Sequence, residues 1–195
     1  MVAVASIEDL RARLQAEAPF LGSRTVRSSG NDQLDRLLGG GFPQEGLTVL
    51  SGRPGSGRST VAAGFIAEHT GQSRPAAWID PSGQLYPPAL VAQGVDLERL
   101  LIVRGAPERC WYAAEQIIDS GAFQAVVVTG GDRFLDAATA RRIQLSAEGA
   151  RVSVLLALNP NTAPRAAQAA LTLNLTRVAR AIQIDITRDR SGSAS

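Results

Sequence analysis

The sequence predicts an α/β fold in which a mainly parallel sheet is covered by helices on both faces. Short apolar stretches alternate with longer stretches of helical periodicity between residues 47 and 158. The apolar stretches are continuous, as in strands that are buried on both faces. A glycine-rich loop at residues 52–57 joins the first strand to a helical stretch, which is the order of a βα unit.

The central elements follow one another in strand–helix order. Five apolar stretches predict strands, at residues 47–50, 76–79, 100–103, 125–128 and 152–158. The stretches between them predict helices, at residues 58–69, 87–93, 108–120 and 133–148. Before the first strand, residues 25–27 predict a short strand. Asn31 then begins a helix that ends at the three glycines 39–41.

The last part of the chain has a different pattern. Apolar and polar residues alternate here, with the apolar positions at Leu171, Leu173 and Leu175 and again at Ile182, Ile184 and Ile186. Period-two alternation predicts an antiparallel strand pair that extends the parallel sheet. We therefore expect a core domain over residues 25–190, an N-terminal arm over 1–24 and a disordered polar tail over 191–195.

The N-terminal arm combines a helix and a connector. Ser6 can cap a helix over residues 6–18, and Pro19 ends it. The apolar residues of the arm can dock on a partner protein or pack against the chain's own core. They are Ile7, Leu10, Leu14, Phe20 and Leu21.

Composition excludes several classes of protein. The 195 residues are 45% hydrophobic and 19% charged, so the chain can bury a core. The single cysteine excludes a disulfide framework, and the N-terminus lacks a signal-peptide pattern. We therefore expect a cytoplasmic protein, and no apolar run is long enough to span a membrane. The net charge of +2 is too balanced to indicate nucleic-acid binding by itself.

The sharpest motif is the stretch GRPGSGRST at residues 52–60. It follows a strand and opens a helix, which is the setting of a phosphate-binding P-loop. The chain contains no lysine, and Arg58 stands where this motif has one. Its planar guanidinium differs from an ammonium in size and reach. The motif is therefore either a nucleotide site or an inherited turn that binds nothing, formed by Gly52, Gly55, Gly57, Arg58, Ser59 and Thr60.

A P-loop enzyme also needs a carboxylate at the end of a neighbouring strand to hold Mg²⁺. The matching strand, residues 125–128, is followed by Thr129 and two glycines. Asp132 comes three residues after Thr129, and we do not assign it this role. The sequence therefore lacks the carboxylate at the expected position.

With these motifs in place, the chain resembles the RecA-like recombinases over roughly residues 25–187. The stretches that carry the resemblance keep their order: SSGNDQLD at 28–35, GGGFPQEGLTV at 39–49, WID at 78–80, GVDLERLL at 94–101 and GAFQAVVV at 121–128. The resemblance implies a RecA-like P-loop core. RecA-like enzymes carry a glutamate two residues after the aspartate of the WID stretch, where this chain has Ser82. Together with Arg58 and Thr129, this departure implies that ATP hydrolysis is lost.

A RecA-like core without these groups resembles the ImuA family, accessory proteins of bacterial damage-induced (SOS) mutagenesis. The resemblance implies an adaptor in translesion synthesis that contacts RecA and ImuB, an inactive relative of Y-family polymerases. We expect no required cofactor and no membrane contact. The segment after Leu158 is too short for a long DNA-binding loop, so we also expect weak or no direct DNA binding.

Two other functions stay open: a DNA-binding recombination mediator without catalysis, and an ATPase of the RecA-like superfamily with atypical motifs. Four arginines near the C-terminus form either a nucleic-acid patch or a solvated strand face. They are Arg177, Arg180, Arg188 and Arg190. His69 lies at the end of the helix predicted over 58–69, where a helix C-terminus favours a cationic histidine, and we expect a capping role.

Overall fold

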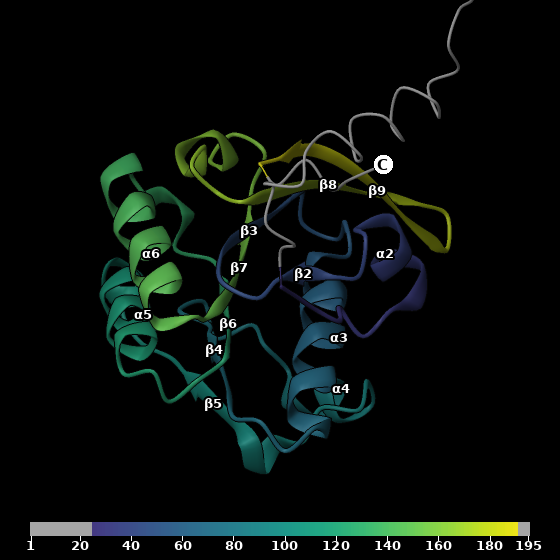
Figure 1. The fold of residues 1–195 in the computed structure, drawn as a ribbon, viewed down its shortest axis with the longest axis horizontal. Coiled ribbons are helices and arrows are strands. Elements are labelled where there is room, and N and C mark those ends of the chain that lie inside the picture. Colours follow the sequence, from purple (N-terminus) through teal and green to yellow (C-terminus); the bar gives the residue numbers. More distant parts are fainter. Residues whose placement is uncertain (1–24, 191–195) are drawn as a thin grey trace, which may run out of the picture.

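A computed structural model describes residues 25–190, which form three layers with one sheet in the middle (Figure 1). The strands of this sheet are β3 (Gly46–Ser51), β4 (Ala76–Ile79), β5 (Leu100–Val103), β6 (Ala125–Thr129), β7 (Ser153–Leu158), β8 (Leu171–Val178) and β9 (Ala181–Asp189). Their order is β5–β4–β6–β7–β3–β8–β9. Neighbours run parallel from β5 to β8, and β9 pairs antiparallel with β8. The predicted α/β class with a terminal antiparallel pair is confirmed.

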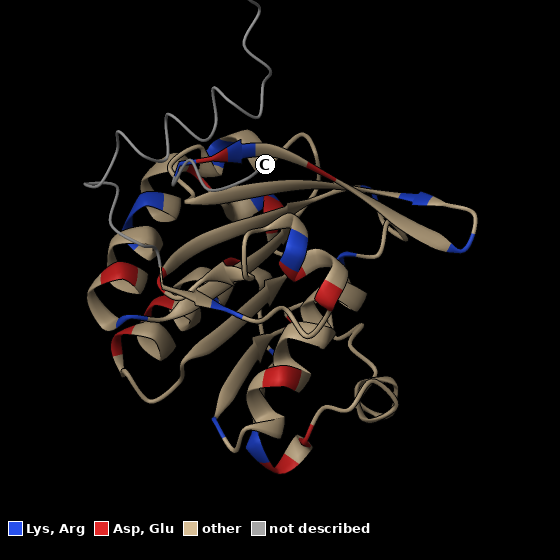
Figure 2. Cartoon of the chain, turned by 45° about the vertical axis from the view of Figure 1, so that its right-hand side comes forward, with Lys and Arg blue, Asp and Glu red and all other residues tan. Residues whose placement is uncertain are grey.

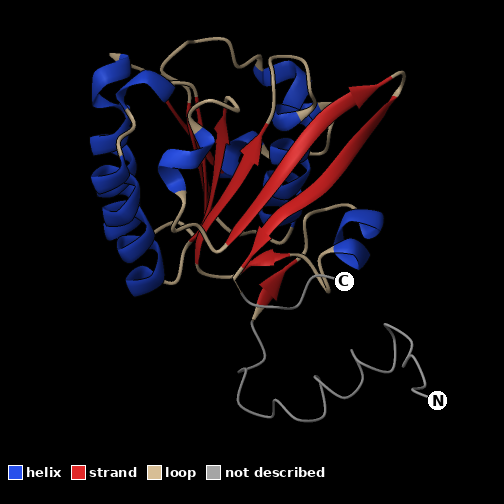
Figure 3. Cartoon of the chain, turned by 90° about the horizontal axis from the view of Figure 1, so that it is seen from above, coloured by secondary structure: helices blue, strands red, loops and turns tan. Residues whose placement is uncertain are grey.

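Helices cover both faces of the sheet. They are α2 (Asp32–Leu37), α3 (Arg58–Gly71), α4 (Pro87–Val91), α5 (Cys110–Asp119) and α6 (Ala137–Ala150). Helices α5 and α6 pack on one face, and α2, α3 and α4 pack on the other (Figures 1 and 3). Along β6, Val126 and Val128 face the first group while Val127 faces the second, and all three are fully buried. Burial on both faces explains why the central strands are continuously apolar.

The helix starts depend on local capping. The side chain of Asn31 accepts hydrogen bonds from the backbone N–H groups of Gln33 and Leu34, each at 3.0 Å, and α2 begins as expected. Helix α6 begins later than the predicted residue 133. A 3₁₀ turn precedes it, and the carboxylate of Asp136 caps it by accepting the N–H of Thr139 at 2.7 Å. Helix α5 likewise follows a 3₁₀ turn, Pro107–Arg109.

The chain enters the core through a small second sheet. Strand β1 (Val26–Arg27) pairs antiparallel with β2 (Phe42–Pro43). At the other end of the core, β8 and β9 form a long hairpin that closes at a turn containing Ala179, which has φ +52° (Figure 3). On β9, Ile182, Ile184 and Ile186 pack toward the α2 and α3 side of the sheet.

Two predicted segments lie outside the described residues. They are the arm over 1–24, with Ile7, Leu10, Leu14, Phe20 and Leu21, and the tail over 191–195. Within residues 25–190, no helix combines the length and apolar character needed to cross a membrane.

Candidate functional site

The residues of the predicted phosphate loop lie between the end of β3 and the start of α3. Gly57 has φ +100° and precedes the first residue of α3, so the loop turns directly into the helix. The loop is tightly packed, since a Cβ at Gly52 would overlap the side-chain oxygen of Ser56, and a Cβ at Gly57 would overlap Ile182 of the hairpin. The Oγ of Ser56 is buried and has no hydrogen-bond partner. The structure therefore confirms the strand–loop–helix setting of the motif.

A cavity of about 560 Å³ opens beside this loop. It is bounded by the start of α3 and by residues at or just after the C-terminal ends of β4, β6 and β7, where ligands bind in parallel α/β sheets. The side chains that give it its chemistry are Arg58, Asp80, Ser82, Thr129, Asp132 and Asn159. The structure thus brings together all three positions at which the sequence departs from the RecA-like pattern.

Arg58 is half-buried at the first turn of α3. Burial is the main cause that lowers the pKa of its guanidinium from the ordinary value, and the nearby negative charge of Asp132 opposes that shift. The guanidinium keeps its charge at neutral pH, because an arginine deprotonates only far above it. A fixed positive charge therefore faces the cavity at the place where the motif has lysine.

Thr129 ends β6, and its hydroxyl is used by the fold. It accepts a hydrogen bond from the indole N–H of Trp78 at 3.0 Å and donates to the carbonyl of Ile79 at 3.4 Å. Trp78 is fully buried, so this bond satisfies a donor that has no access to water. The position that would carry a metal-binding carboxylate instead joins β6 to β4.

Asp80, at the end of β4, is also engaged within the chain. Its side chain is almost fully buried and accepts hydrogen bonds from the hydroxyl of Ser82 at 2.7 Å and from the N–H of Leu85 at 2.8 Å. The guanidinium of Arg104 lies 3.6 Å from its second oxygen. Asp80 and Ser82 therefore hold the loop that follows β4.

Asp132 is a cavity residue to which the sequence interpretation gave no role. Gly130 and Gly131 both have positive φ, +81° and +72°, and the chain turns so that Asp132 returns to the cavity. Its carboxylate accepts the backbone N–H of Asn159 at 2.6 Å, which fixes it beside β7. The paired glycines directly after an apolar strand were the available signal for this turn.

The four C-terminal arginines do not form one patch. Arg177 and Arg180 flank the turn of the β8–β9 hairpin, whereas Arg188 and Arg190 lie near its other end (Figure 2). Arg190 also donates to the carbonyl of Gln168 at 2.9 Å. Of the four, Arg177 alone borders the 560 Å³ cavity beside the phosphate loop, called the P-loop cavity below.

His69 is not the cationic cap that its position predicts. It lies in α3 with 2% of its surface exposed, and its Nδ1–H donates to the carbonyl of Phe65 at 2.9 Å. Burial lowers the pKa of the imidazole to about 4, and the positive charges of Arg27 and Arg74 act in the same direction. The ring is therefore neutral at pH 7.

A family model and individual relatives both show similarity of this chain to RecA proteins. The model of the RecA N-terminal domain matches residues 21–143, more than half of the chain. Protein RecA of Picosynechococcus sp. is 37% identical over 101 residues, which are 51% of this chain and 29% of that protein. Protein RecA of Streptococcus pyogenes is 37% identical over 105 residues, 53% of this chain and 28% of that protein. The matches thus span less than a third of the length of these relatives.

Proposed function

The chain belongs to the RecA family, and from that premise we propose that it is a non-hydrolysing member that acts through protein contacts. The process we propose is DNA-damage-induced (SOS) mutagenesis, in which the chain is an adaptor of the ImuA type for translesion synthesis. The general RecA-family relationship supports a role in DNA repair or recombination. The narrower assignment rests on the sequence resemblance and on the chemistry of the P-loop cavity.

The bond between Trp78 and Thr129 carries the non-hydrolysing part of the proposal. A P-loop enzyme needs a carboxylate near this strand end to hold Mg²⁺ through water. A threonine hydroxyl brings no negative charge, and this one already holds a buried indole N–H and a carbonyl. Thr129 at this strand end is therefore better suited to holding the sheet together than to binding a metal ion.

The other two substituted positions support the same proposal. Ser82 has no group that can take a proton from an attacking water at neutral pH, and its hydroxyl donates a hydrogen bond to the carboxylate of Asp80. Arg58 keeps a positive charge but presents it in a rigid planar fork. The loop itself fits a phosphate group, because its glycines and helix start are in place. The two carboxylates of the cavity, Asp80 and Asp132, both accept hydrogen bonds from the chain itself. We therefore infer that the cavity does not support hydrolysis of a Mg²⁺–nucleotide, and we assign no required cofactor.

The proposed partners are RecA and an ImuB-type relative of Y-family polymerases. The docking residues on this chain would be the apolar residues of the arm, Ile7, Leu10, Leu14, Phe20 and Leu21. A RecA-like surface is a natural acceptor, because a short apolar segment can add to an exposed sheet edge or groove.

Binding to the RecA protein of the same genome tests this assignment. We expect the full chain to bind, the variant Phe20→Asp to lose at least about tenfold in affinity, and the matched variant Ala12→Asp to bind normally. Equal binding by both variants would refute docking through the arm. Absence of binding by the unaltered chain would refute the RecA partnership.

A DNA-binding mediator without catalysis is the second candidate function. The observation that favours it is the pair of exposed arginines at the hairpin turn, Arg177 and Arg180. Single-strand binding that weakens steeply with salt, and that Arg180→Ala reduces, would support this function. The adaptor proposal predicts weak binding without such a dependence on Arg180.

A further inference from the structure

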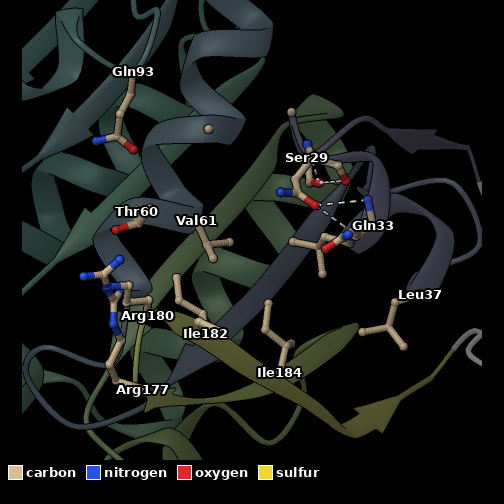
Figure 4. A pocket seen from close by; sticks show the side chains of 15 residues that line it. Ser29, Gln33, Leu37, Thr60, Val61, Gln93, Arg177, Arg180, Ile182 and Ile184 are labelled. Atoms are coloured by element: carbon tan, nitrogen blue, oxygen red, sulfur yellow. Dashed lines mark hydrogen bonds between the residues drawn. The ribbon is translucent and has the colours of Figure 1, made fainter.

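A groove beside the P-loop cavity lies between α2, α3 and the β8–β9 hairpin (Figure 4). We call it the hairpin groove; its volume is about 660 Å³. Figure 4 shows Val61 of α3 and Ile182 and Ile184 of β9 on its walls, with Leu37 of α2 at one end. These four apolar side chains are each partly exposed. Covering them would remove apolar surface from water, which is favourable.

The charged side chains of the hairpin groove are positive and lie at one end. Arg177 and Arg180 lie together at the end away from Leu37 (Figure 4). Among the described residues that line the groove, none carries a carboxylate. An occupant that is apolar along its length and acidic at one end would therefore match it.

We propose that residues 6–18 of the same chain bind in the hairpin groove. The spacing of Ile7, Leu10 and Leu14 predicts a helix with one apolar stripe. Such a helix is about 20 Å long, so it can place the stripe against the apolar walls on both sides of the groove. Helix-in-groove recognition uses apolar anchor residues at this i, i+3, i+7 spacing.

The point where the segment joins the core makes this contact reachable. The carbonyl of Thr25 accepts the N–H of Gln44 at 2.9 Å, which fixes the chain at the first described residue. Ser29 already lines the hairpin groove. The connector over residues 19–24 spans up to about 20 Å when extended, enough to return a helix to a groove that begins so close in the chain.

The segment has mixed charges, with Glu8, Asp9 and Glu17 beside Arg11 and Arg13, and the acidic pair at its start sets its direction. Glu8 and Asp9 lie in the first turn of the predicted helix. Ser29, close in sequence to the connector, lies on the α2 side of the groove, away from Arg177 and Arg180 (Figure 4). A helix whose C-terminal end joins the connector on that side has its first turn toward the two arginines. Opposite charges then meet at that end.

This inference goes beyond the proposed function and is tested without any partner. The arm would occupy the chain's own groove until a partner competes for the same apolar residues, so that partner binding and groove exposure are linked. Failure of the RecA experiment would leave the groove contact unaffected, and failure of the groove contact would leave the RecA experiment unaffected.

Thiol labelling of the full chain tests the contact. Leu37→Cys places a thiol in the groove, and Leu145→Cys places one on α6, where the native side chain is 52% exposed on the opposite face of the sheet. The native Cys110 gives little background, because burial raises its pKa to about 11. Each thiol is measured alone, in a chain that also carries either Leu10→Asp or Ala12→Asp.

Leu10→Asp puts a charge in the apolar stripe, whereas Ala12→Asp puts the same charge on the opposite side of the predicted helix. We expect Leu10→Asp to increase the labelling rate at residue 37 about tenfold. This factor corresponds to a loss of about 1.4 kcal/mol in the free energy with which residues 6–18 bind the groove. Ala12→Asp should leave that rate unchanged, and neither change should affect residue 145. Ile184→Cys repeats the test at a second groove position in case Leu37→Cys perturbs α2.

Two results would overturn the proposal. One is equal labelling of both groove thiols in the Leu10→Asp and Ala12→Asp backgrounds. The other is protection that disappears on dilution, because the occupant would then be a second copy of the chain.

Discussion

Acid should destabilise this protein partly through His69, in a defined pH window. The side chain is 2% exposed, its Nε2 has no hydrogen-bond partner, and it lies edge-on to Phe65 with ring centroids 4.3 Å apart. Protonation would place a charge in this apolar site, near the positive charges of Arg27 and Arg74. The folded protein therefore resists binding a proton that the unfolded chain binds readily.

The magnitude follows from the two pKa values. The imidazole pKa is about 4 in the folded protein and 6.5 in a model compound. Each unit of difference corresponds to about 1.4 kcal/mol, so the neutral His69 contributes about 3 kcal/mol to the free energy of unfolding above pH 6.5. Because the folded pKa is the lower one, this contribution is present above pH 6.5 and is lost as the pH falls from 6.5 to 4.

Urea unfolding of the native chain and of His69→Leu, measured between pH 8 and pH 4, tests this prediction. His69 is the single histidine of the chain, and the carboxylates that titrate below pH 5 are common to both proteins. The difference in free energy of unfolding between the two proteins should therefore change by about 3 kcal/mol in favour of the variant as the pH falls. A difference that stays constant within about 0.5 kcal/mol would refute the buried neutral histidine.

Three further predictions concern the fold around the site. In thermal unfolding, Gly30→Ala should lower the stability by several kcal/mol, because φ is +78° and the new Cβ would overlap the Gly64 carbonyl oxygen. The control Gly121→Ala, with φ +63° and open space around the new Cβ, should cost only about 1 kcal/mol. Thr129→Val should lower the free energy of unfolding by about 1–3 kcal/mol in urea titrations, since the indole N–H of Trp78 loses its buried acceptor; an unchanged midpoint would contradict the bond. Asn31→Ala should cost about 1 kcal/mol through the lost cap of α2, and Asn31→Asp should restore most of it.

Most of the sheet could be predicted from the sequence, because burial on both faces demands continuous apolar strands. Strands β4 and β5 have the predicted bounds, Ala76–Ile79 and Leu100–Val103. Strands β6 and β7 differ from the prediction by one residue at one end, and β3 extends one residue further at both ends. The alternation of Leu171–Leu175 and Ile182–Ile186 likewise predicted the hairpin, because one face of each strand packs on the core and the other is exposed.

The site was predicted less completely, because tertiary packing decides what its side chains do. The loop at residues 52–60 was evident from its motif. The position of Asp132 depends on two positive φ angles that place it beside Asn159, and sequence spacing alone argued against it. The neutral state of His69 depends on Phe65 and the buried face of α3, which a helix-end rule does not include.

The start of α6 shows the same limit at the local level. A helix from residue 133 satisfies the apolar periodicity, but Asp136 competes as a cap by accepting the N–H of Thr139. The 3₁₀ turn at Asp132–Phe134 then fills the interval. Capping side chains therefore decided the boundary where periodicity left it open.

ATP hydrolysis by the purified full chain tests whether the P-loop cavity has lost phosphoryl transfer. Phosphate release is measured with Mg²⁺ and ATP, with and without single-stranded DNA, beside the RecA protein of the same genome and the Arg58→Ala variant. We expect RecA to release phosphate when DNA is present, whereas the chain and its Arg58→Ala variant stay at the buffer rate with and without DNA. DNA-stimulated release by the native chain that Arg58→Ala abolishes would contradict this expectation, and would mean that the cavity around Arg58 and Asp132 still performs phosphoryl transfer.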